Sequence, residues 1–158
     1  MGKAVLEDFA VGETFETASY TISLDESLAF ARAYDPQPFH LDADAAGRAI
    51  FGELTCSGWH TTAIAMRLIV DSNVLRETGI IGTGVDELRW LAPVKPGDTL
   101  RVRGEIVEAI RSQRRPDRGT LRVRLVTVNQ DGVAVMSQIA NLVVPAAGPA
   151  NPSPRLQR

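Results

Sequence analysis

Two residues in the first third of the chain, Asp35 and His40, have the types and the spacing for acid–base chemistry. They begin and end the segment Asp35-Pro-Gln-Pro-Phe-His40, which its two prolines make stiff. Across a bent backbone, side chains at this spacing can converge on one water molecule. A carboxylate and an imidazole in that arrangement act as general acid and base near neutral pH. Spacing alone leaves a second interpretation open, in which Asp35 caps a helix end or a turn and His40 packs beneath the loop.

A second group of candidate residues is the segment Cys56-Ser-Gly-Trp-His60. Ser57 is a plausible N-cap of the helix that follows, and Gly58 allows a ligand to approach the backbone closely. The free N–H groups at a helix N-terminus carry partial positive charge and can polarise a carbonyl oxygen. The alternative is an ordinary N-cap in which glycine is tolerated in the first helical turn.

The remaining reactive residue types give weaker signals. Cys56 is the only cysteine, so it forms no internal disulfide, and packing explains it as well as a nucleophilic role. His60 is expected to be structural, and the two histidines with Asp42 show no metal-ligand spacing, so we expect no metal site. The arginine-rich segment 111–118 is expected to be a solvated hairpin loop, with contact to ligand phosphates as the alternative.

Two helical segments are predicted to position these residues. Ser23 and Glu26 have capping-box spacing at the start of a helix over residues 22–34, and Asp35-Pro36 ends it. A short helical turn is predicted over 43–49. The long helix begins after Ser57 and is predicted to run to residue 76. Because it is apolar over most of its circumference, we expect other structure to enclose it.

Beyond the long helix, the apolar period changes from 3.6 to 2, which predicts strands. They are expected at residues 82–91, 99–106, 121–125 and 133–144, with one more at 14–22 before the first helix. The segment 133–144 is apolar on both faces and should be a central strand. Gly97-Asp98 and Asp131-Gly132 are expected to form turns. An antiparallel sheet wrapped around one long helix satisfies this order of elements, so the predicted fold class is α+β.

Composition limits the classes of partner. The 158 residues suit one domain, and a formal net charge of −2 gives no reason to expect nucleic acid as a partner. No apolar run approaches the ~18 residues of a membrane span, so we expect no membrane segment and a cytoplasmic protein. Residues 146–158 are rich in proline and are expected to form a flexible tail after a domain over residues 1–145.

Taken together, these features resemble the MaoC-like hydratases of the hotdog superfamily, which include the (R)-specific enoyl-CoA hydratases. The resemblance covers about residues 5–144 and is carried by three stretches: 35–42, Ser57-Gly58, and 90–98. Asp35, Pro38 and His40 match the hydratase motif, while Gln37 stands where asparagine is usual. This chain also has Ser57 where family members commonly have histidine, and Ala63 where some have serine.

The resemblance implies a hotdog fold and the reversible hydration of a trans-2-enoyl thioester. Asp35 and His40 would hold and deprotonate the water, and the N–H of Gly58 would stabilise the enolate-like oxygen. Ser57, Trp59 and Pro38 would contact the substrate, with the bulky Trp59 narrowing the acyl pocket. The resemblance implies no cofactor beyond the coenzyme A of an acyl-CoA substrate, with an acyl carrier protein as the less favoured carrier. It also implies a homodimer or a dimer of dimers.

Two other functions fit the same residues. A hotdog acyl-CoA thioesterase would also use a carboxylate, a water molecule and a helix N-terminus. A non-catalytic acyl-CoA-binding hotdog protein would bind the thioester without turnover.

Overall fold

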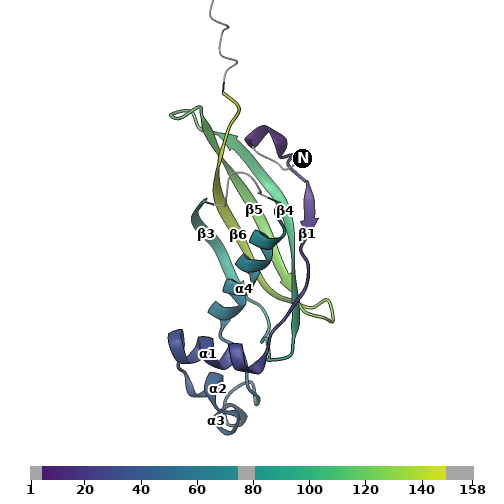
Figure 1. The fold of residues 1–158 in the computed structure, drawn as a ribbon, viewed down its shortest axis with the longest axis vertical. Helices are drawn as coiled ribbons and strands as arrows, with labels where there is room; N and C mark the ends of the chain where they lie inside the picture. Colours follow the sequence, from purple (N-terminus) through teal and green to yellow (C-terminus); the bar gives the residue numbers. More distant parts are fainter. Residues whose placement is uncertain (1–4, 75–80, 149–158) are drawn as a thin grey trace, which may run out of the picture.

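The computed structural model describes residues 5–74 and 81–148, and its main feature is an antiparallel sheet with one helix along its face (Figure 1). Within the described residues the strand order is β1-β4-β5-β6-β3, and β2 also pairs with β4. The strands are β1 (Thr14–Glu16), β2 (Tyr20–Thr21), β3 (Ile81–Trp90), β4 (Thr99–Arg111), β5 (Arg118–Val128) and β6 (Ala134–Pro145). The helices are η1 (Leu6–Asp8), α1 (Leu24–Tyr34), α2 (Pro38–Leu41), α3 (Ala43–Gly47) and α4 (Gly58–Asp71). The predicted α+β class is confirmed.

Helix α4 packs one side against the sheet and forms the core with it. Its buried residues recur at helical spacing: His60, Thr61, Ile64, Ala65, Leu68 and Ile69. We predicted that other structure encloses this helix, but the sheet covers only one side of it. On the other side, Met66 and Val70 are 47% and 50% exposed. The core of a single chain therefore satisfies one apolar stripe of α4 and leaves the second uncovered.

Strand β6 lies between β5 and β3, which confirms the prediction that an apolar run over 133–144 is a central strand. The predicted turns at Gly97 and Gly132 are also confirmed, and both glycines have the positive φ (+95° and +75°) that favours glycine. Strands β4 and β5 are longer than predicted. They pair with each other from Arg101 to Arg111, with one bulge between Ile106 and Glu108.

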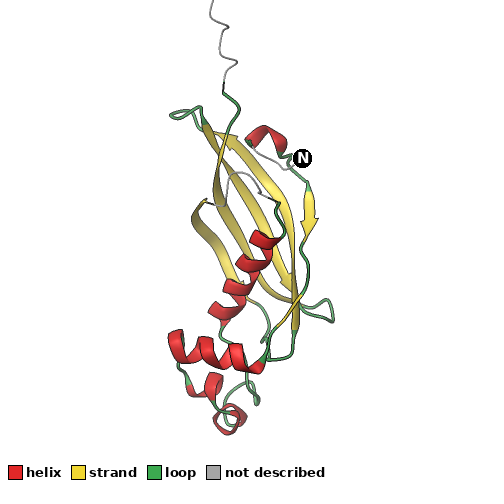
Figure 2. Ribbon diagram, viewed as in Figure 1, coloured by secondary structure: helices red, strands yellow, loops and turns green. Residues whose placement is uncertain are grey.

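The helical predictions hold with small changes. Ser23 caps α1 by accepting a hydrogen bond from the Glu26 N–H at 3.2 Å, and Ser57 caps α4. Helix α4 ends at Asp71, and residues 75–76 of the predicted span lie outside the described residues. The short helix α2 was not predicted. Figure 2 shows α1, α2 and α3 gathered at one end of the sheet, next to the start of α4.

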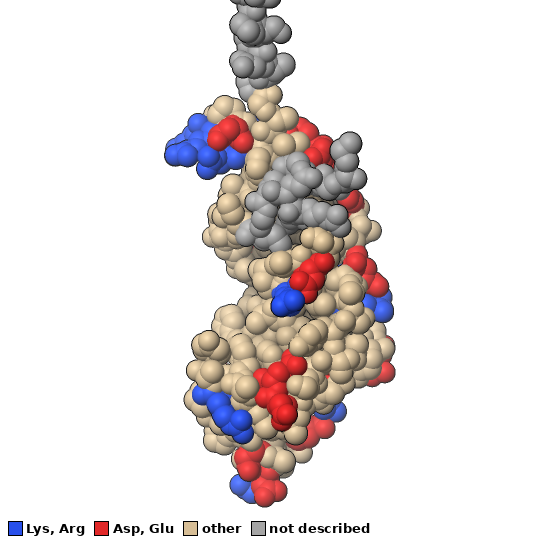
Figure 3. Space-filling model, in the orientation of Figure 1, with Lys and Arg blue, Asp and Glu red and all other residues tan. Residues whose placement is uncertain are grey.

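The arginine-rich segment 111–118 forms the β4–β5 hairpin loop, as predicted. It lies at the opposite end of the sheet from α1–α3, where Figure 3 shows a concentration of basic side chains. Arg111 pairs with Glu7 at 2.7 Å, and Arg118 pairs with Asp117 at 2.9 Å. Within one chain, this loop is therefore too far from the α4 N-terminus to serve a ligand bound there.

Residues 146 and 147, at the start of the predicted tail, make backbone hydrogen bonds to the domain. The N–H of Ala146 donates to the Asp117 carbonyl at 2.8 Å, and the N–H of Ala147 donates to Glu7 Oε2 at 2.9 Å. These two residues therefore attach to the domain. Residues 149–158 of the predicted tail lie outside the described residues.

Candidate active site

Asp35 and His40 converge, which is one of the two arrangements that their spacing left open. Asp35 is the C-cap of α1, and His40 is the third residue of α2. Asp35 Oδ2 lies 3.3 Å from His40 Nε2, and the side chains are only 17% and 8% exposed. Pro38 opens α2 at a position where proline is preorganised for a helix, and this turn carries the imidazole back toward the carboxylate. Asp35 thus serves as a helix cap and as the partner of His40 at once.

The imidazole of His40 is fixed by a backbone carbonyl that sequence reasoning missed. His40 Nδ1 lies 2.7 Å from the carbonyl oxygen of Thr55, which only accepts hydrogen bonds. We therefore assign the proton of neutral His40 to Nδ1. The second ring nitrogen, Nε2, then carries a lone pair beside Asp35 Oδ2, so both atoms are acceptors and a water molecule in the cavity can donate to both.

Asp35 is held as a carboxylate by two side-chain donors. The Ser57 hydroxyl donates to Oδ2 at 2.7 Å, and the Gln37 amide donates to Oδ1 at 2.7 Å. Burial raises the pKa of Asp35, but these hydrogen bonds and the nearby His40 outweigh burial, so its pKa lies below the ordinary value of 3.8. Gln37 therefore contributes an amide donor to the acid–base pair.

The N-terminus of α4 adds an open backbone donor. The Ser57 hydroxyl accepts from the Trp59 N–H at 3.3 Å, while the N–H of Gly58, the first helical residue, has no acceptor within the helix. Trp90 packs directly on Gly58: a Cβ at this position would lie 2.6 Å from Trp90 Cε2. The Trp90 Nε1–H also donates to the Gly58 carbonyl at 2.9 Å. Glycine is required here because the indole occupies the space of a side chain.

These groups face one cavity of about 370 Å³. Among its lining residues are Asp35, His40, Gly58 and Trp59, four of the six predicted site residues. Ser57 is 1% exposed and reaches the site through Asp35 rather than by lining the cavity. Among the described residues, those that line this cavity do not include Pro38. Pro38 instead opens α2, the helical turn that carries His40.

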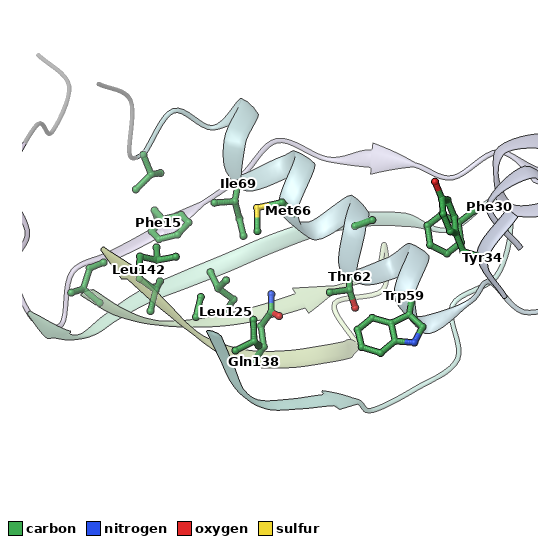
Figure 4. A pocket seen from close by; sticks show the side chains of 16 residues that line it. Phe15, Phe30, Tyr34, Trp59, Thr62, Met66, Ile69, Leu125, Gln138 and Leu142 are labelled. Atoms are coloured by element: carbon green, nitrogen blue, oxygen red, sulfur yellow. The ribbon is translucent and has the colours of Figure 1, made fainter. Parts of the chain in front are cut away.

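A second hollow, an apolar groove of about 500 Å³, runs between α4 and the sheet. Figure 4 shows Phe15, Ile69 and Leu142 toward one end of it and Thr62 and Trp59 toward the other. Sequence reasoning missed this groove because its lining residues come from α1, from α4 and the residues just after it, and from five strands (β1, β3, β4, β5 and β6). Trp90 was also missed as a site residue, although it opens the stretch 90–98 that carries the family resemblance.

Two weaker candidates have structural roles. Cys56 is buried, and burial raises its pKa to about 11, so its thiol stays protonated at neutral pH. His60 stacks on Phe30 with ring centroids 4.7 Å apart, and burial lowers its pKa despite the nearby Glu26. Over residues 5–74 and 81–148, no group of three or more His, Cys, Asp or Glu side chains has an arrangement that could hold a metal ion. No helix in that same part of the chain is long and apolar enough to cross a membrane.

Comparison with known proteins identifies the fold and the family of this chain. A family model described as "MaoC like domain" matches residues 8–129. YdeM of Bacillus subtilis, described as uncharacterised, is 34% identical over 131 residues, which are 82% of this chain and 91% of YdeM. A solved MaoC-like dehydratase from Rhodospirillum rubrum is 43% identical with a TM-score of 0.88, covering 93% of this chain and all (100%) of that one.

A second solved structure, the (R)-hydratase PhaJ1 from Pseudomonas aeruginosa, is 29% identical with a TM-score of 0.69 and covers 90% of this chain and 86% of that one. These likenesses confirm the hotdog fold that the resemblance implied. The family match includes Asp35, His40 and Gly58, the three residues that meet at the cavity. The chain therefore belongs to the MaoC-like domain family.

Proposed function

We propose that this protein is a hydro-lyase that adds water reversibly to a trans-2-enoyl thioester to give a 3-hydroxyacyl thioester. The observation that carries the proposal is the meeting of Asp35 and His40, 3.3 Å apart, in the same cavity as the open N–H of Gly58. Membership of a family that includes dehydratases, and likeness to a solved (R)-hydratase, support the same reaction class.

Each group has a defined task in the proposed reaction. Nε2 of His40 accepts a proton from the water held beside Asp35, while the water oxygen forms a bond to C3 of the substrate. The electron pair of the C2–C3 double bond moves toward the thioester, and its carbonyl oxygen becomes an enolate oxygen that accepts a hydrogen bond from Gly58. Protonated His40 then returns its proton to C2. The two hydrogens and the oxygen of water are thereby added, and dehydration is the reverse.

The protonation states of the pair suit these tasks. Asp35, with its lowered pKa, remains a carboxylate at neutral pH and stabilises the imidazolium that forms on His40. The Thr55 carbonyl holds the Nδ1 proton, so only Nε2 exchanges a proton with the substrate. The thioester carbonyl itself activates C3, so the proposed reaction uses no metal or redox cofactor, and coenzyme A enters as part of the substrate.

We also propose that the working form is a homodimer or a dimer of dimers. Strand β3 has a strand neighbour on one side only within the described part of the sheet, which leaves backbone donors and acceptors open along its other edge. Beside it, the outward stripe of α4 exposes Met66 and Val70. A second copy that covers both would remove an open edge and an apolar surface together.

A product assay tests the function. Purified protein is mixed with crotonyl-CoA, and loss of the enoyl-thioester absorbance is followed in parallel with a free-thiol reagent. Hydration removes the absorbance without releasing thiol. Thiol release in step with substrate loss would instead identify the thioesterase, and binding without any turnover would identify a non-catalytic acyl-CoA-binding protein.

A further inference from the structure

We propose that Trp59 sets the upper limit of acyl chain length by separating the catalytic cavity from the apolar groove; this rests on the proposed function. Trp59 lines both the 370 Å³ cavity that holds Asp35 and His40 and the 500 Å³ groove along α4. Figure 4 shows its indole toward one end of the groove, and the same side chain lines the catalytic cavity. An acyl chain that runs from the catalytic cavity along the wall into the groove therefore passes this side chain.

The indole of Trp59 is braced against a fixed neighbour. It meets Trp90 edge to face, with ring centroids 5.0 Å apart and an interplanar angle of 80°. Trp90 is anchored in turn, since its Nε1–H lies 2.9 Å from the Gly58 carbonyl and 3.3 Å from Thr62 Oγ1. Moving Trp59 to admit a longer chain would break a favourable aromatic contact beside the backbone donor of the site.

The groove on the other side of Trp59 has the chemistry of an acyl site. Its walls include Phe15, Met66, Ile69 and Leu125, which are apolar and spread along α4 and the sheet. The native protein should therefore take short acyl groups that end at Trp59. Removing the indole should join the two hollows and admit chains that continue into the groove.

The test compares trans-2-butenoyl-CoA with trans-2-octenoyl-CoA as substrates for the wild type, Trp59→Ala and Trp59→Leu. The measured quantity is the ratio of kcat/KM for the C8 substrate to that for the C4 substrate. Each methylene group buried in an apolar site improves binding about fourfold. Four added methylenes, partly buried in the joined groove, should therefore raise this ratio at least about tenfold. Trp59→Leu gives a second reading if the alanine variant is poorly folded by circular dichroism.

Leu125→Val is the matched control, because Leu125 lines the groove but not the catalytic cavity and lies on β5, away from the outward stripe of α4. It enlarges the groove without opening the boundary, so the C8/C4 ratio should stay at the wild-type value. A wild type that hydrates C4 and C8 equally well, or Trp59 variants that keep the wild-type ratio, would overturn the role of Trp59 and leave the proposed function intact. A folded wild type that hydrates neither substrate would overturn the proposed function, and this inference with it.

Discussion

Removal of the Ser57 hydroxyl should weaken both the acid–base pair and the fold, in a manner that depends on pH. Ser57 Oγ donates to Asp35 Oδ2 at 2.7 Å and also accepts from the N–H of Trp59 at the start of α4. Ser57→Ala therefore removes a hydrogen bond to a charged group and a helix cap with one substitution. The hydroxyl touches Asp35 and not the substrate, so Ser57 acts as a positioning residue.

The magnitude follows from these two contacts. A hydrogen bond to a charged group contributes about 1.5–3 kcal/mol, and the lower end applies because Asp35 keeps the Gln37 amide as a donor. Loss of a serine N-cap adds about 1 kcal/mol. The free energy of unfolding should therefore fall by about 2.5 kcal/mol at pH 7, and the melting temperature by about 5–10 °C. A loss of about 1.4 kcal/mol in the placement of Asp35 corresponds to a tenfold fall in kcat/KM for hydration.

The pH dependence has a definite sign. Asp35 has a folded-state pKa below its ordinary value of 3.8, so its carboxylate stabilises the fold above that pH, and this contribution is lost as the pH falls through the folded-state value. Ser57→Ala removes the largest influence that lowers the pKa. The stability difference between wild type and variant should thus shrink from about 2.5 kcal/mol at pH 7 toward the ~1 kcal/mol of the cap alone as the pH falls below 3.8 and through the folded-state pKa of Asp35. The buried His60 is present in both proteins and cancels from the difference.

Urea unfolding at intervals from pH 7 down to pH 2 measures this difference, with Ser27→Ala as the control. Ser27 is also a 1% exposed serine, but its hydroxyl donates to Cys56 Sγ at 3.3 Å and to no carboxylate. The Cys56 thiol has a pKa of about 11 and does not titrate in this window, so the effect of Ser27→Ala should be independent of pH. A Ser57→Ala effect that is equally flat with pH would refute the role assigned to the Ser57–Asp35 hydrogen bond.

Three further predictions concern the site and the assembly. His40→Ala and Asp35→Asn should each lower hydration of crotonyl-CoA by about 10² to 10⁴ with the fold intact by circular dichroism, and the double variant should be little worse; near-wild-type rates in both single variants would eliminate the pair. Gly58→Pro and Gly58→Ala both add a Cβ that meets Trp90 at 2.6 Å, but only proline removes the N–H, so proline should be slower than alanine by about 10² to 10³; equal rates would show that Gly58 is only a helix start. Sedimentation at micromolar concentration should show a dimer or tetramer, and a stable monomer of about 17 kDa would contradict the proposed pairing at β3.

Much of the local structure could be predicted because its causes are short-range. The caps at Ser23 and Ser57 are set by residues within three positions of them, and alternating burial along β4, β5 and β6 follows from side-chain period alone. The approach of Asp35 to His40 was one of the arrangements that the sequence allowed, because two prolines limit the conformations of the backbone between them. The central position of β6 was predictable because a strand apolar on both faces needs cover on both.

Only the tertiary structure decided which distant groups complete the site. The Thr55 carbonyl meets His40 across 15 positions, Ser57 meets Asp35 across 22, and Trp90 meets Gly58 across 32. These contacts depend on the path of the loop after α3 and on the pairing of β3 with β6, which sets the place of Trp90 opposite Met136. The groove beside Trp59 has the same origin. Sequence periodicity specifies which face of an element is apolar, but the packing of several elements together decides where a hollow remains between them.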